Sequence, residues 1–562
     1  MKRKDIIRSQ ALLFLILFVH SSCLFAKKDF YRAAVLELSQ FTNISYPAAD
    51  ILRINLNIYD LAASTAAKHE ADIIVFPESG LLPFEKPNRE WLLDFIEDIP
   101  DPKKMLTNPC AEPDLFSDRP IITKLSCLAR HNNIYVVANT ADFKKCETDK
   151  NCDKDNSNCT VCPKDGHFFY NTNVVFNREG TLIAKYYKRH LYFEPEMNTP
   201  HKPEDAYFDT DFGNFSTFIC FDLMFKEPVK AIGNLSVLNV AYPTYWFDHT
   251  PLIFFATPYQ QAWAMANKVN LLAANGHHPQ TGSLGSGIYS SSKGALIYTH
   301  NPDGRSKLLI SNVPISPRDN TIDTNNLNPM RFFIENGTIV AAKGEEKPIF
   351  KKECLNTVLG DGKPGDYRCG PTNVDQYEFK KLQGNKGKIT SCSNKLCCWL
   401  DYDSHSMDED YYFGVSGKDL NFYDEFSFGT EACFIARCES YEGKSCTNFK
   451  LVSHTIFRKV EIRGNFTTKY ILPFAIDSEM RLTNKDNWSF YESRIVYDNL
   501  NKKSSLLFFG VYGRLFEKDK DLYNQPDGAV RISCTGDWLI FGLLVSLSLF
   551  LFLKAYENGK YS

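Results

Sequence analysis

The chain has 562 residues, of which 44% are hydrophobic, 14% aromatic and 23% charged, and its formal net charge is −3. This length exceeds what one hydrophobic core usually holds, so at least two domains are expected. The small net charge gives the chain no overall basic character, which argues against nucleic acid as a partner. The apolar and charged fractions are ordinary for a globular protein.

Residues 1–26 begin with the basic stretch MKRKDIIRSQ and continue with the apolar stretch ALLFLILFVHSSCLFA. This order predicts a secretory signal peptide that ends near Ala26, with an uncleaved signal anchor as the alternative. Secretion implies an oxidising compartment, where cysteines form disulfides and Asn-x-Ser/Thr motifs accept glycans. The chain has seven such motifs, at Asn43, Asn158, Asn214, Asn234, Asn336, Asn465 and Asn487.

Strands and helices are predicted to alternate in the first half of the chain, residues 27–320. Apolar side chains recur every three or four residues from 48 to about 70, which predicts an amphipathic helix with Ser45 and Pro47 at its start. Nearly continuous apolar runs predict strands that are buried on both faces. The predicted strands are 32–41, 71–79, 134–139, two within 171–190, 215–222, 237–246 and 270–275, and further helices are predicted at 121–130 and 259–269. This alternation predicts an α/β sandwich.

The second half has a different texture. Between about 325 and 515, short alternating strands separated by Gly, Asn and Asp turns predict a β-rich second domain. Near the end, Trp538–Leu553 is apolar or small and uncharged. Small residues at Asp527–Ala529 precede it, so 528–562 is predicted to be a removed GPI signal, with Asp527 as the lipidation site. A single-pass membrane anchor is the alternative.

The cysteine count agrees with a disulfide-bonded ectodomain. Of 17 cysteines, Cys23 would leave with the signal peptide and Cys534 with the tail, and a free Cys220 leaves 17 − 3 = 14, an even number. Disulfides are favoured over a zinc site for the cysteine-rich insertion at 146–162. A bridge between Cys110 and Cys127 is predicted from proximity, and the adjacent Cys397 and Cys398 are each predicted to bridge elsewhere.

Three residues at strand ends are candidates for chemistry. Glu78 closes the buried strand ADIIVFPES, Lys188 lies near the end of the segment TLIAKYYKRH, and Cys220 lies in FSTFICFDLMF at the end of a hydrophobic strand. A buried strand-end carboxylate needs a partner or a task, and a thiol on a strand-to-helix turn can lie near backbone N–H groups. Each residue alone also has an ordinary structural interpretation, as a loop glutamate, a solvated lysine or an inert cysteine.

Together these residues resemble the nitrilase (carbon–nitrogen hydrolase) superfamily, whose Glu–Lys–Cys triad occurs in this order on an α-β-β-α sandwich. The similarity is stronger to the branch that contains the vanins (pantetheinases) and biotinidase. The supporting strings, in the right order along nearly the whole mature chain, are VFPESGL, LSCLAR, IYVVAN, YNTNVVFNREG, HLYFE, FICFDLMFKEPV, QAWAMANKVNLLAAN, GSGIY, CCWL and VYGRLFEKD.

The resemblance implies a role for each residue. Glu78 would be the general base, Lys188 the proton donor or oxyanion stabiliser, and Cys220 the nucleophile of a linear amide hydrolase that forms a thioester. Glu194 matches an acidic position that would orient the lysine or the substrate. The resemblance implies no metal and no organic cofactor.

The implied substrate is a small amide, with two candidates inside the family. Cleavage of pantetheine to pantothenate and cysteamine is preferred, because the predicted lipid anchor is vanin-like. Hydrolysis of biotinyl amides, a catalytically silent adhesion or signalling ectodomain, and acyl transfer in place of hydrolysis are the alternatives. Tyr245, Trp246 and Trp263 are predicted either to line the substrate pocket or to pack in the core. The expected location is the outer face of the cell membrane, or the secreted state, and the oligomeric state is open.

Overall fold

The computed structural model describes residues 29–521, except for 84–87, 147–161, 250, 345, 347–373, 423–424, 442–444, 450 and 500–503. The predicted signal peptide, the tail at 528–562 with Asp527, and the motif at Asn158 lie outside these ranges. No helix within them combines the length and the apolar character that crossing a membrane requires.

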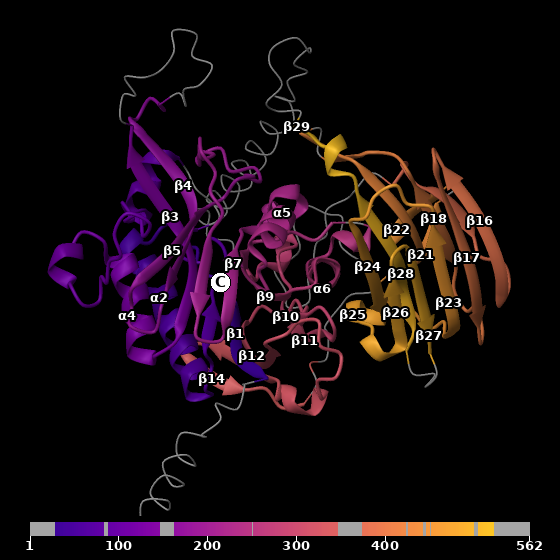
Figure 1. Ribbon diagram of the computed structural model, residues 1–562, viewed down its shortest axis with the longest axis horizontal. Coiled ribbons are helices and arrows are strands. Elements are labelled where there is room, and N and C mark those ends of the chain that lie inside the picture. The colour runs from indigo at the N-terminus through magenta and orange to yellow at the C-terminus, as the bar shows by residue number, and fades with distance from the viewer. Residues whose placement is uncertain are drawn as a thin grey trace, which may run out of the picture.

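The first domain contains two mixed sheets (Figure 1). The larger sheet has the strand order β14 (Thr338–Ala341), β13 (Met330–Glu335), β12 (Ser306–Pro314), β1 (Phe30–Glu37), β2 (Ile73–Val75), β3 (Tyr135–Lys145), β4 (His167–Phe176) and β5 (Leu182–Tyr187). The smaller sheet has the order β11 (Gly294–Thr299), β10 (Ser286–Ser290), β9 (Asn270–Asn275), β8 (Asn239–Thr244), β7 (Gly213–Thr217) and β6 (Tyr207–Thr210). Strands β1, β2 and β3 are parallel, as are β7, β8 and β9.

Helices cover the outer faces of both sheets. The α-helices are α2 (Ala48–Lys68), α3 (Arg89–Leu92), α4 (Pro120–Asn132), α5 (Lys226–Leu235) and α6 (Ala256–Asn267). Alternate residues of β1 face opposite cores: Ala34 and Leu36 pack with α2 and α4, whereas Ala33 and Val35 pack against the smaller sheet. Helices α5 and α6 cover the far face of the smaller sheet. The predicted α-β-β-α sandwich is therefore confirmed.

Three details differ from the sequence prediction. Helix α2 begins after Pro47 without a side-chain cap, so Ser45 does not cap it. Strand β7 ends at Thr217, and a 3₁₀ turn, η3 (Cys220–Met224), replaces the predicted continuation of the strand. Strands β13 and β14, which were predicted to open a second domain at 325, extend the first sheet through β12. These two strands belong to the first sheet because β13 forms backbone hydrogen bonds with β12, and β14 with β13. The sequence alone does not reveal which strands pair.

The second domain is a β-sandwich. One sheet has the order β15 (Glu378–Lys381), β18 (Tyr411–Ser416), β21 (Thr430–Tyr441), β28 (Leu506–Arg514), β24 (Ile471–Asp477) and β25 (Arg481–Leu482), with β22 (Ser445–Phe449) paired to β21. The other has the order β16 (Lys386–Ser393), β17 (Leu396–Ser404), β23 (Phe457–Gly464), β27 (Arg494–Asp498) and β26 (Trp488–Tyr491). A short sheet of β19 (Leu420–Phe422), β20 (Phe426–Phe428) and β29 (Lys520–Asp521) completes the domain.

The two domains share one apolar core. Side chains of α6 and of the smaller first-domain sheet belong to the same buried cluster as Phe434, Phe474 and Phe508 of the second domain. Figure 1 shows α6 beside β24. The backbone N–H of Leu482 also donates to the Tyr298 hydroxyl across the interface at 3.0 Å.

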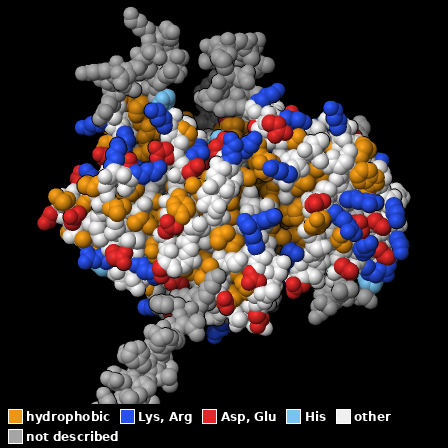
Figure 2. Space-filling model, viewed as in Figure 1, with side chains coloured by type: hydrophobic (Ala, Val, Ile, Leu, Met, Phe, Trp, Pro, Cys, Tyr) orange, Lys and Arg blue, Asp and Glu red, His pale blue; other side chains and the backbone are white. Residues whose placement is uncertain are grey.

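Charges of both signs are interspersed on the surface. Figure 2 shows lysine and arginine side chains gathered at the edge of the second domain where β16 and β17 lie, mixed with acidic ones. Lys388 of β16 pairs with Asp401 of β17 at 3.3 Å, and in the same sheet Arg494 of β27 pairs with Glu461 of β23 at 2.9 Å. Among the predicted glycan acceptors, Asn43, Asn234, Asn336 and Asn465 are exposed, while Asn214 and Asn487 are half-buried. Glycosylation remains a prediction at every motif.

Disulfides in the described ranges include Cys110–Cys127, Cys146–Cys162, Cys392–Cys397 and Cys398–Cys433. The bridge between Cys110 and Cys127 is as predicted, and the adjacent Cys397 and Cys398 do bridge to different partners. Neighbouring residues of a strand point to opposite faces, so Cys397 pairs within the β16–β17 hairpin and Cys398 pairs across the sandwich to β21.

We expect these two bridges to differ in their contribution to stability. Cys398–Cys433 closes a chain separation of 35 residues, and Cys392–Cys397 a separation of 5. Loop-closure entropy gives about 4 kcal/mol for the long loop and about 2 kcal/mol for the short one. The double variant C398A/C433A should therefore lower the thermal unfolding midpoint more than C392A/C397A, as measured by calorimetry. Equal midpoints would contradict this account.

Candidate active site

Glu78 lies buried at the carboxyl end of the larger sheet, three residues after β2. Its Oε1 accepts from Lys188 Nζ at 2.7 Å and from Asn171 Nδ2 at 2.8 Å. Its Oε2 accepts from the backbone N–H of Tyr245 at 2.8 Å. Ser79, which follows, has φ of +53°, and its N–H donates to Asn139 at 2.8 Å. The chain is therefore turned sharply so that the carboxylate faces the other sheet.

Lys188 follows β5 directly and is 2% exposed. Its ammonium contacts Glu78, and also Glu194 Oε1 at 2.5 Å. The Asn171 amide donates to both carboxylates, reaching Glu194 Oε2 at 2.7 Å. One ammonium and one amide thus hold two carboxylates together, and Asn139 Nδ2 in turn donates to the side-chain Oδ1 of Asn171 at 2.7 Å.

Cys220 opens the η3 turn and is the free cysteine of the described residues. Its φ of +43° is left-handed and costly for a residue with a side chain, so the surroundings must impose it. Asp222 accepts from the Ile219 N–H at 3.1 Å and from the Tyr186 hydroxyl at 2.9 Å. The Tyr242 hydroxyl donates to the Cys220 carbonyl at 2.7 Å.

Asp222 also connects the cysteine turn to the lysine segment. Its Oδ1 accepts from the backbone N–H groups of Arg189 at 3.2 Å and His190 at 3.0 Å, immediately after Lys188. One buried carboxylate therefore fixes the relative positions of the thiol and the ammonium, which lie on different sheets.

Burial and charge set the protonation states. Burial raises the pKa of Glu78, against the opposing effect of Lys188. Burial lowers the pKa of the Lys188 ammonium, but Glu194 and Glu78 outweigh it and hold that pKa well above its ordinary value. Burial and then the charge of Glu78 raise the pKa of the Cys220 thiol, against Lys188, the Thr244 side chain and the Tyr245 N–H. The resting site thus contains a protonated Cys220 thiol beside the Glu78 carboxylate, whose pKa is raised.

A pocket with about 340 Å³ of empty volume, its opening to solvent included, lies against Cys220. Aromatic side chains dominate its wall, and the lining includes Tyr192, Phe221, Trp246, His249, Phe254 and Phe422. Trp246 therefore lines the pocket, whereas Trp263 belongs to the buried core, and Tyr245 contributes its backbone N–H to Glu78. Such a wall suits the apolar part of a small ligand.

The sequence analysis missed several residues of the site. Asn171 and Asp222 lie within the strings YNTNVVF and FICFD, and a polar residue in an otherwise apolar run is the signal that would have drawn attention to them. The Tyr245 N–H and Phe422 carry no such signal, because a backbone donor and a remote aromatic side chain are placed by the tertiary fold.

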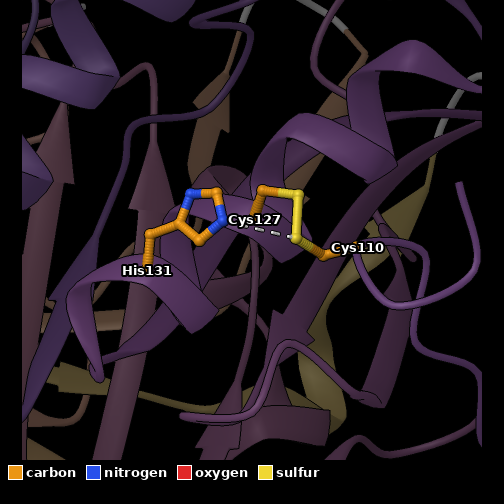
Figure 3. Close-up of side chains that lie close together, drawn as sticks. All are labelled: Cys110, Cys127 and His131. Atoms are coloured by element: carbon orange, nitrogen blue, oxygen red, sulfur yellow. Dashed lines mark hydrogen bonds between the residues drawn. A yellow bond between two sulfur atoms is a disulfide. The ribbon is translucent and has the colours of Figure 1, made fainter.

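One group of potential metal ligands lies elsewhere in the described ranges. Cys110, Cys127 and His131 have ligand atoms within 4.8 Å of one another. Figure 3 shows that the two sulfur atoms are joined in a disulfide, with His131 Nε2 3.9 Å from Cys110 Sγ. A disulfide has no thiolate to offer, so these side chains do not form a metal site in this oxidation state.

Residues 32–287 match the Carbon-nitrogen hydrolase family, and residues 368–519 match the Vanin C-terminal domain. Human pantetheine hydrolase VNN2 is 32% identical over 89% of each chain. Human biotinidase is 30% identical over 87% of this chain and 90% of its own. Among solved structures, an amidase from Nesterenkonia sp. is 18% identical over 53% of this chain and 95% of its own, with a TM-score of 0.36.

The sandwich, with its thiol and its carboxylate–ammonium cluster, defines a nitrilase-type amidase. The chain belongs to the carbon–nitrogen hydrolase family, in the group of pantetheinases and biotinidases that carries a vanin C-terminal domain. It is a hydrolase of carbon–nitrogen bonds other than peptide bonds.

The pH dependence of Cys220 alkylation tests the electrostatics without any substrate. Glu78→Gln removes a negative charge that favours the protonated thiol, so the alkylation midpoint should move to lower pH. Lys188→Met removes a positive charge that favours the thiolate, so its midpoint should move to higher pH. Labelling by iodoacetamide across pH, followed by mass spectrometry of the Cys220 peptide, measures both shifts.

Lys185→Met is the matched control for this experiment. Lys185 lies on β5, three residues before Lys188, and pairs with Asp142 at 2.8 Å. It is not among the groups that act on the thiol. Its midpoint should equal that of the wild type. Shifts of the same sign in the Glu78 and Lys188 variants would refute the proposed charge arrangement.

Proposed function

We propose that this enzyme hydrolyses pantetheine to pantothenate and cysteamine, with Cys220 as nucleophile, Glu78 as general base and Lys188 as electrostatic stabiliser. The observation that carries the assignment is a buried ammonium shared by two carboxylates beside a free thiol on a left-handed turn. The substrate is supported by the similarity to human pantetheine hydrolase VNN2.

The reaction begins with transfer of the Cys220 proton to Glu78. The sulfur attacks the amide carbonyl carbon, and the negative charge that develops on the oxygen is stabilised by Lys188. The C–N bond then breaks, and the amine leaves with the proton returned by Glu78. This leaves a thioester on Cys220.

Hydrolysis of the thioester restores the enzyme. Glu78 takes a proton from water, and the resulting hydroxide attacks the thioester carbonyl. The C–S bond then breaks to release the acid, and Glu78 returns the proton to the Cys220 sulfur. The raised pKa of Glu78 makes it a stronger base in both half-reactions. The raised pKa of Lys188 keeps it charged throughout, so it stabilises charge without losing its proton. Glu194 orients the ammonium through their shared contact.

Hydrolysis of biotinyl amides is the second candidate, since human biotinidase is nearly as similar to this chain. An assay of purified enzyme on pantetheine and on biocytin decides between them. A silent ectodomain has no need for this buried charge cluster, whose components are costly to bury.

Cys220→Ala and Glu78→Gln should each reduce pantetheine hydrolysis by at least about 100- to 10,000-fold. Lys185→Met should retain activity within about threefold, since its ion pair lies outside the cluster. Release of cysteamine, measured with a thiol reagent, gives the rates, and circular dichroism checks folding. Undiminished turnover in C220A would refute the mechanism.

We also propose that the enzyme acts at the outer surface of the cell membrane, tethered by a GPI anchor attached near Asp527. Support comes from disulfides such as Cys110–Cys127 and Cys398–Cys433, which suit an oxidising compartment. Two modules are proposed, a catalytic domain that begins near 27 and whose larger sheet extends through β14 to Ala341, and a β-rich domain that ends near 515.

Treatment of expressing cells with phosphatidylinositol-specific phospholipase C should release the enzyme into the medium. The enzyme in the supernatant and on cells is measured by immunoblotting. Retention on cells, with release of a known GPI-anchored control, would favour the single-pass anchor. Its presence in the medium without treatment would favour simple secretion.

A further inference from the structure

The second domain reaches the turn that carries Cys220. Phe221, the next residue, packs against three side chains of the β19–β20 hairpin. Its ring centroid lies 6.1 Å from Phe422, 5.1 Å from Phe426 and 6.1 Å from Phe428. The catalytic turn is therefore in contact with a domain whose strands begin more than 150 residues later in the chain.

A buried arginine holds the other end of the same turn. Arg514 of β28 is 1% exposed, and its Nη2 donates to the Met224 carbonyl at 2.9 Å. Its Nη1 donates to the Gly429 carbonyl at 2.8 Å, and Asp519 balances its charge at 2.7 Å. The left-handed Cys220 thus begins a turn that the second domain contacts at both Phe221 and Met224.

Of the three hairpin phenylalanines, Phe422 also lines the pocket beside Cys220. Its ring lies 6.2 Å from that of Tyr192 and 5.3 Å from that of His249, both of which line the same pocket. Phe426 and Phe428 contact Phe221 but are not part of the pocket wall. Within the hairpin, Phe426 and Phe428 therefore support the turn, whereas Phe422 also forms part of the pocket wall.

We propose that Phe422 is a specificity-determining residue: the second domain supplies it as the wall that limits the bulk of the acyl chain presented to Cys220. This inference rests on the proposed function, in which Cys220 receives the acyl group. An aromatic wall favours a slender, partly apolar chain that lies along its face, and it excludes a wide group by steric overlap.

Kinetics with two substrates test the role. Phe422→Ala should raise KM and lower kcat/KM for pantetheine by about 10- to 200-fold, with kcat changed much less. It should also raise the relative kcat/KM for a pantetheine analogue with a bulkier acyl chain. Phe426→Ala removes the same number of atoms from the support of Phe221 and is the matched control. It should change kcat/KM for the two substrates equally, so that their relative kcat/KM stays close to the wild-type value.

A second readout is independent of the substrate. Alkylation of Cys220 by N-methylmaleimide and N-benzylmaleimide compares a small and a wide group with the same reactive centre. The benzyl-to-methyl rate ratio should rise about tenfold in F422A, stay unchanged in F426A, and fall below the wild-type value in Phe422→Trp, which also serves if F422A does not fold.

The two readouts separate the inference from the proposed function. If the wild type hydrolyses neither pantetheine nor its analogue while the alkylation ratios change as described, the proposed substrate is refuted. The role of Phe422 as the pocket wall is then still supported. If F422A leaves the alkylation ratio unchanged, or F426A changes it equally, Phe422 acts only by supporting the turn and the inference is overturned.

Discussion

The site depends on the Lys188 ammonium, buried between the carboxylates of Glu78 and Glu194. A buried charge is costly unless it is paired and hydrogen-bonded, and here one cation meets two anions. The excess negative charge is spread by Asn171 and by the Tyr245 N–H, which donate to the carboxylates. This arrangement keeps a charged base next to a neutral thiol, which is the starting state that proton transfer from Cys220 requires. Removal of the ammonium would leave two like charges buried together.

The geometry of the thiol has a different origin. Cys220 has a left-handed backbone conformation, so the strain must be offset by contacts around the turn. Asp222 ties this turn to the segment after Lys188, and Tyr242 holds the Cys220 carbonyl. Phe422 and Arg514 add contacts from the second domain. The shared core between the domains is therefore functional, because it fixes the part of the chain that presents the sulfur.

The sequence was sufficient to predict the sandwich, most of its strands and the four charged or nucleophilic residues of the cluster. Buried parallel strands read as apolar runs, so Glu78 at the end of one was accessible to sequence reasoning. Lys188 follows β5, an antiparallel strand that buries alternate residues, and its role was implied by the family resemblance. Strands β13 and β14 were assigned to the wrong domain, because alternation does not reveal which sheet a strand joins. Phe422 was missed because its role depends on packing between residues about 200 positions apart in the sequence, Phe221 and Phe422. The predicted strand was extended through Cys220, where the structure has a 3₁₀ turn, because backbone strain has no signature in composition.

The central claim is that Cys220 carries the acyl group between the two half-reactions. The most direct test is to quench wild-type enzyme with acid during steady-state turnover of pantetheine and to measure the masses of its peptides. The account predicts a pantothenoyl adduct on the peptide that contains Cys220, which disappears when the substrate is exhausted. Turnover with an adduct on a different residue would contradict it. So would turnover that leaves no adduct on the Cys220 peptide under conditions that slow hydrolysis of the thioester.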